Sequence, residues 1–94
     1  MIKKKQDWSV REQIELKNDQ ALVLPGYDDA IIGVCYQYGR PPVVAYDYNL
    51  VITHLMGNDD MTYQEAVEYY EFNIEGSFLG DSTPVFIQKL SKTK

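Results

Sequence analysis

The sequence predicts an α+β fold, a small antiparallel sheet of about three to four strands with two helices (48–56 and 62–75) packed on one face. Two segments carry this prediction. AIIGVCYQYG (30–39) alternates and is rich in β-branched and aromatic residues, as strands are. MTYQEAVEYYEFNIEG (61–76) repeats apolar residues every three or four positions, as an amphipathic helix does.

A single domain (1–94) is expected, because the chain is shorter than the usual domain of about 100–150 residues. Apolar residues make up 45% of it, which is too many for a disordered protein. Residues 1–19 and 89–94 are expected to be peripheral or flexible. No segment approaches the roughly 20 apolar residues of a membrane helix, and no apolar run follows MIKKKQDWSV as it would in a signal peptide. The only cysteine, Cys35, rules out an internal disulfide and favours a reducing compartment.

The first third of the chain gives weaker signals. Residues 9–19 fit either a short helix, opened by Ser9 with Glu12 as its capping-box partner, or an extended segment. ALVLPG (21–26) predicts a strand that stops in a Pro-Gly turn.

A hairpin is predicted next. Its first strand should direct Ile32, Val34, Tyr36 and Tyr38 to one face, and Ile31, Gly33, Cys35 and Gln37 to the other. A turn at 39–42 leads to a partner strand at 42–46, and so short a connection favours antiparallel pairing. Residues 84–90 are expected to form the closing strand, with proline at its edge.

Asp47 is expected to cap the first of the two helices, because its carboxylate can accept a backbone N–H. The residues that share the apolar face of this helix are Leu50, Val51, His54 and Leu55. Residues 57–60 should end it.

The second helix has the stronger signals. Thr62 and Glu65 form a reciprocal capping box, and Met61 is placed to pack on Ala66 one turn inside. Gly76 is expected to stop the helix in a left-handed conformation.

Charge is distributed unevenly along the chain. The net charge is −5, yet Lys3, Lys4, Lys5, Lys89, Lys92 and Lys94 all lie near the two ends. Between residues 41 and 88 there is no lysine or arginine, so an acidic body lies between basic ends.

No catalytic or metal-binding signature stands out. Cys35 and His54 could form a nucleophile pair, but a small thiol in a strand and a histidine on an apolar helix face are commonly structural. Aspartates 28–29 and 59–60 could bind a divalent ion, but aspartate is equally common in turns and caps. The sequence therefore predicts no enzyme, no cofactor and no metal.

The outer side of the second helix is the predicted site for a protein partner. Adjacent glutamates there cost a few tenths of a kcal/mol per pair, which a helix with interspersed lysines would avoid. A merely solvated face is the alternative interpretation. The predicted contact residues are Glu65, Glu68, Tyr69, Glu71, Phe72 and Glu75.

The segments GYDDAIIGV, VVAYDY, MTYQEAVEYYEFN and TPVF, in this order, resemble a family of small, mostly uncharacterised proteins of tailed bacteriophages and prophages. The likeness covers about residues 26 to 87, with Gln64 where the family tends to have glutamate. It implies a phage origin and expression in the host cytoplasm. It supplies no catalytic residues.

The leading hypothesis is a non-enzymatic phage accessory protein that binds and modulates or inhibits a host protein. A partner with a basic nucleic-acid-binding groove fits the acidic body, and a host-defence complex is one version, with anti-CRISPR action as an example. Direct binding of the body to nucleic acid is not expected.

Two alternatives stay open. A small-molecule or nucleotide-binding or sequestering protein would use Tyr27, Asp28, Asp47 and Asn73, which lie at the ends of elements. A virion or assembly component would contact nucleic acid through its lysine-rich ends. Both a homodimer and a monomer are compatible with the sequence.

Overall fold

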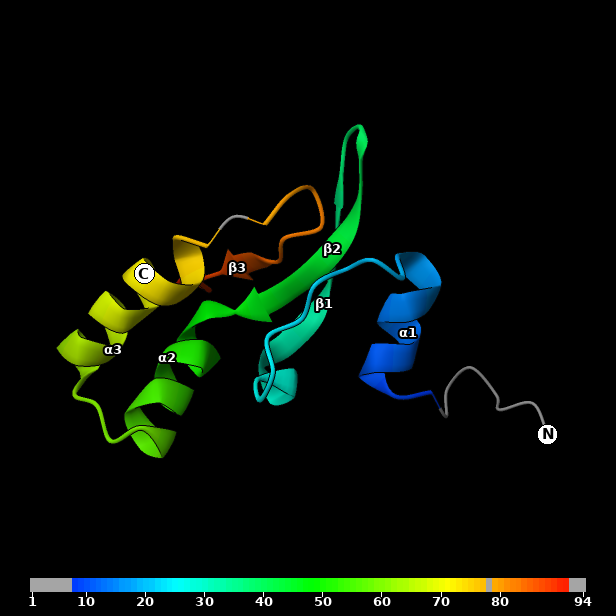
Figure 1. Ribbon diagram of the computed structural model, residues 1–94. Coiled ribbons are helices and arrows are strands. Elements are labelled where there is room, and N and C mark those ends of the chain that lie inside the picture. Colours follow the sequence, from blue (N-terminus) through cyan, green and yellow to red (C-terminus); the bar gives the residue numbers. More distant parts are fainter. Residues whose placement is uncertain (1–7, 78, 92–94) are drawn as a thin grey trace.

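The computed structural model describes residues 8–77 and 79–91 and has an α+β fold (Figure 1). Its elements are, in chain order, α1 (Val10–Lys17), the short 3-10 helix η2 (Asp28–Ala30), β1 (Ile31–Gln37), β2 (Arg40–Asp47), α2 (Tyr48–Asn58), α3 (Tyr63–Tyr70), the π-helical turn η3 (Glu71–Glu75) and β3 (Val85–Ile87). The lysines at 3–5, 92 and 94 lie outside the described residues.

Among the described residues, the sheet has three strands in the order β1-β2-β3 and is mixed. β1 pairs antiparallel with β2, as predicted, but β3 pairs parallel to β2, so the prediction of a wholly antiparallel sheet is wrong. The reason is the connection: the chain passes through α2, α3 and η3 before it reaches β3, and such a helical crossover returns it in the same direction. α2 contacts β2 and lies beside α3 (Figure 1), whereas the packing of both helices on one face stays a prediction.

The hairpin turns earlier than predicted, at residues 38–39, where Gly39 has a φ of +71° that suits glycine. β2 accordingly begins at Arg40. The pairing of β1 is irregular between Ile31 and Gly33, and both Ile31 and Val34 pack against the core. The predicted strict alternation is therefore wrong, because an irregularity of this kind changes which face the following residues reach.

The open alternative at the start of the chain is decided in favour of a helix. Ser9 and Glu12 form the capping box of α1, and Ile14 anchors this helix in the core. Residues 21–24 are not a strand, contrary to prediction; the N–H of Leu22 donates to the Ser82 carbonyl at 3.1 Å, without a continuing ladder.

Asp47 caps α2 as predicted, because its carboxylate accepts the N–H of Leu50 at 3.2 Å. The helix runs to Asn58 rather than to residue 56. Its buried face consists of Val51, Ile52 and Leu55, whereas the side chain of Leu50 is exposed. The observed apolar face is therefore turned about the helix axis relative to the predicted one.

The capping box of Thr62 and Glu65 at the start of α3 is confirmed. The single α-helix predicted to residue 75 is wrong in its last part, which forms η3. Gly76 is also not left-handed, because its φ is −72°. A Cβ at this position would lie 3.0 Å from the carbonyl oxygen of Glu71. Steric crowding by that carbonyl, rather than a left-handed backbone, therefore explains why this residue is glycine.

One core joins the helices to the sheet. Its buried members are Ile14, Ala30, Val44, Tyr46, Val51, Ile52, Leu55, Ala66 and Tyr70. Phe86 of β3, which is shorter than the predicted 84–90 strand, stacks on Tyr46 at 5.6 Å between ring centroids and meets Tyr70 edge-on at 5.3 Å. This aromatic contact ties β3 and α3 to the central strand.

Candidate protein-binding surface on α3

The core contacts of α3 decide which of its sides faces outward. Ala66 and Tyr70 are buried, and they share one face because they are four residues apart. Glu65, Glu68 and Tyr69 are exposed on the side turned away from that face. The capping box holds the start of the helix in place, so this outer side is presented on a fixed element.

A shallow depression of about 520 Å³ lies along the outer side and continues into η3 and the α2–α3 turn. We call it the α3 depression, and it is lined by Asp59, Asp60, Met61, Glu65, Glu68, Tyr69, Phe72 and Asn73. Four of the lining side chains are carboxylates and none is basic.

Two large aromatic side chains lie among these carboxylates. The side chain of Phe72 is 83% exposed and that of Tyr69 is 42% exposed. Phe72 is carried by the π-helical turn η3, and single π-helical turns occur frequently at functional sites. The depression thus combines exposed apolar area with negative charge.

The structure brings together four of the six residues predicted to contact a protein partner: Glu65, Glu68, Tyr69 and Phe72. Glu71 and Glu75 are exposed but do not line the depression. Burial raises the pKa of Tyr70, and Glu75 adds to this increase through its charge and a side-chain hydrogen bond. Glu75 therefore lies on the Tyr70 side of the helix.

Sequence reasoning missed Asp59, Asp60 and Met61 as members of this surface. A signal was available, since these residues directly precede the capping box at Thr62, and the residues just before a helix start lie close to its first turn.

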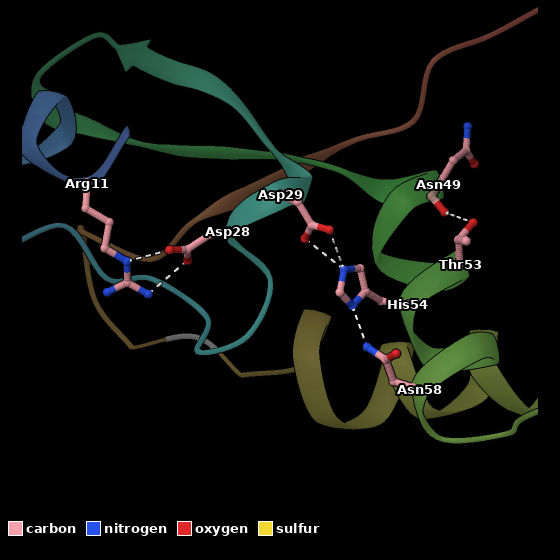
Figure 2. Close-up of polar contacts among 7 residues, drawn as sticks. All are labelled: Arg11, Asp28, Asp29, Asn49, Thr53, His54 and Asn58. Atoms are coloured by element: carbon pink, nitrogen blue, oxygen red, sulfur yellow. Dashed lines mark hydrogen bonds and ion pairs between the residues drawn. The ribbon is translucent and has the colours of Figure 1, made fainter. Parts of the chain in front are cut away.

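A polar cluster connects η2 to α2 near this surface (Figure 2). His54 Nε2 lies 2.8 and 3.0 Å from the two carboxylate oxygens of Asp29, and Asn58 Nδ2 lies 2.9 Å from His54 Nδ1. If the Asn58 amide donates to Nδ1, then Nε2 carries the hydrogen and donates to Asp29. The ring of Tyr27 packs against that of His54 at 5.2 Å between centroids.

These contacts give His54 a structural role. Both of its ring nitrogens already have partners, and Cys35 lies half-buried in β1 opposite Val43. Within residues 8–77 and 79–91, no contact joins Cys35 to His54, so the geometry offers no nucleophile and base pair.

The four residues of the small-molecule alternative have different partners in the structure. Asp28 binds Arg11 through two hydrogen bonds of 2.9 Å (Figure 2), and Asp47 caps α2. Tyr27 packs on His54, and Asn73 donates to the Tyr69 carbonyl at 3.2 Å.

Among the residues that the structure describes, no group of three or more histidine, cysteine, aspartate or glutamate side chains is arranged to hold a metal ion. In the same residues, each helix is too short or too polar to cross a bilayer. Comparisons with family models, with curated proteins and with solved structures find no match to this chain.

Proposed function

We propose that this chain is a non-enzymatic protein that binds another protein and modulates or inhibits it through the α3 depression. One observation carries the proposal: the exposed rings of Tyr69 and Phe72 share a depression with the carboxylates of residues 59–60, Glu65 and Glu68. A surface of this composition is complementary to a basic groove with apolar walls.

Electrostatics supports a basic partner. The lining carboxylates lie in a stretch, 41–88, that contains no lysine or arginine, so no neighbour along the chain offsets their charge. Such a field attracts a positively charged surface over about 10 Å at 0.1 M salt and weakens as salt rises. The carboxylates are therefore expected to speed association and, through the faster rate, to strengthen binding most at low salt.

The aromatic side chains supply the contact energy. Interface residues that dominate binding are enriched in large aromatic side chains near the centre of the contact. The faces of Tyr69 and Phe72 can also receive arginine side chains, whose guanidinium groups stack on rings and pair with adjacent carboxylates.

The resemblance to phage proteins suggests the setting. We propose a host protein as the partner, in the cytoplasm of the infected bacterium, with a groove that ordinarily receives nucleic acid. A nucleic-acid-handling or host-defence complex has such grooves, and an acidic protein bound there would compete with the phosphate backbone.

Affinity capture from a bacterial host lysate tests this function. The tagged wild-type chain is compared with Phe72→Ser, which removes an 83% exposed ring from the depression, and with Leu90→Ser, which removes an equally exposed (83%) side chain elsewhere. The wild type and Leu90→Ser should retain the same stoichiometric protein at low salt, and Phe72→Ser should lose most of it. Quantitative mass spectrometry measures the amounts.

The proposal is wrong if the wild type retains no specific protein at low or moderate salt. It is also wrong if Phe72→Ser and Leu90→Ser retain equal amounts of the partner.

A further inference from the structure

A second surface of the molecule lies at the opposite edge of the fold, along β1. Within residues 8–77 and 79–91, the sheet order makes β1 an edge strand that is paired on one side only. In the described chain, the backbone hydrogen bonds of residues 32–37 join β1 to β2 and to no other element. From Ala30 to Gly39 there is neither a charged residue nor a proline, which are common features that keep exposed edges from pairing.

An apolar crevice flanks the first half of this edge. Its volume is about 200 Å³, and it lies between Val10, Gln13 and Ile14 of α1 and residues 31–34 of β1. Gln13 is the only polar side chain in its lining, and its amide donates to the Trp8 carbonyl at 3.1 Å.

A matching side chain protrudes from the other end of the strand. Tyr38, in the hairpin turn, is fully exposed. Its ring makes none of the aromatic contacts found among the described residues. One molecule therefore carries both a protruding aromatic ring and an apolar crevice along the same strand.

We propose that the occupant of this edge is a second copy of the chain, with its β1 paired antiparallel to the first. Antiparallel pairing centred on Cys35 places Tyr38 of the second copy opposite Ile32, and pairing centred on Tyr36 places it opposite Val34. Both Ile32 and Val34 line the crevice. Tyr38 lies in the turn that directly follows β1, so this pairing brings its exposed ring beside the crevice of the other copy.

Symmetry favours a second copy over an unrelated strand, and the lack of charge along the strand permits it. Antiparallel pairing of identical strands is two-fold symmetric, so the ring and the crevice are each used twice. Two chains of net charge −5 repel each other, and the uncharged stretch 30–39 allows close contact without placing carboxylates together. The α3 depression is not part of this contact and stays available.

Light scattering after size exclusion, over a range of concentrations, tests the proposal. The wild type should reach twice the 10.9 kDa mass of one chain as concentration rises. Tyr38→Ala should weaken dimerisation at least tenfold, because the crevice loses its occupant. The matched control is Tyr63→Ala, which removes an exposed tyrosine from α3.

A second variant approaches the same contact from the crevice. Val10→Glu places a charge at the crevice wall, at the first position of α1, where glutamate suits a helix. It should weaken the dimer as Tyr38→Ala does, and circular dichroism should show both variants folded. A wild type that stays monomeric at high concentration, or a dimer that survives both substitutions, overturns the proposal. Equal weakening by Tyr63→Ala does so as well.

Discussion

Tyr46 is fully buried in the central strand, and its hydroxyl oxygen accepts the backbone N–H of Leu24 at 2.7 Å. Burial raises the pKa of this hydroxyl, so it stays neutral over the usual range of pH. The bond attaches residues 21–24, which have no strand ladder of their own, to the core. A tyrosine here therefore does more than fill space.

Tyr46→Phe is expected to lower the free energy of unfolding by about 1–3 kcal/mol, because the N–H of Leu24 loses its acceptor in a partly buried site. Urea unfolding measures the change. Tyr36→Phe removes a hydroxyl from an exposed ring and should leave stability nearly unchanged. Equal effects of the two substitutions would contradict the role given to Tyr46.

The ion pair of Arg11 with Asp28 should make stability depend on acidic pH. The Arg11 hydrogen bonds hold the pKa of Asp28 below its ordinary value of 3.8. A lowered pKa gives stability that is present above the unfolded-state value and is lost as pH falls through the folded-state value. Asp28→Asn should therefore lower the free energy of unfolding at about pH 6. The difference in this free energy between the variant and the wild type should shrink as pH falls below 3.8.

Thermal melts of wild type and variant at several pH values give this difference. Asp81→Asn is the control, because Asp81 is an exposed aspartate without this arginine. A difference between wild type and Asp28→Asn that stays constant over the acidic range would refute the account.

At the scale of elements, the sequence predicted what depends on neighbours within one helical turn. The cap at Asp47 and the Thr62–Glu65 box were correctly predicted, because each needs only side chains three residues apart. The π-helical turn after Tyr70 was missed. Apolar spacing at 70 and 74 fits an uninterrupted α-helix equally well, so periodicity cannot distinguish the two.

Alanine is expected to have opposite effects on stability at two glycines, one inside α2 and one directly after η3. Gly57, inside α2, has open space where a Cβ would be, so Gly57→Ala should raise the free energy of unfolding by up to about 1 kcal/mol. Gly76→Ala should lower it by about 1 kcal/mol, because the new Cβ would press on the Glu71 and Phe72 carbonyls. The midpoints of urea unfolding measure both changes. Stabilisation by both substitutions would contradict the crowding at Gly76.

At the scale of the whole molecule, long-range pairing limited what could be predicted. The direction of β3 depends on the crossover through both helices, which no local pattern in 84–90 reveals. Helical spacing correctly placed Glu65 and Glu68 with Tyr69 on one outer side. It could not add Asp59, because a turn rather than a helix brings that residue into the depression.

The central claim is that the α3 depression holds a partner. Its most direct test compares the affinity of the captured partner for two charge-reversal variants of this chain. Glu68→Lys changes a carboxylate that lines the depression, and Glu71→Lys makes the same change in net charge at an exposed position of η3 outside it. Titrations at about 0.05 and 0.3 M salt separate local pairing from general attraction.

The account predicts that Glu68→Lys weakens binding at least tenfold at low salt and that Glu71→Lys weakens it much less. The difference in affinity between the two variants should become smaller as salt rises. Equal weakening by the two reversals, or an affinity indifferent to both, would contradict it.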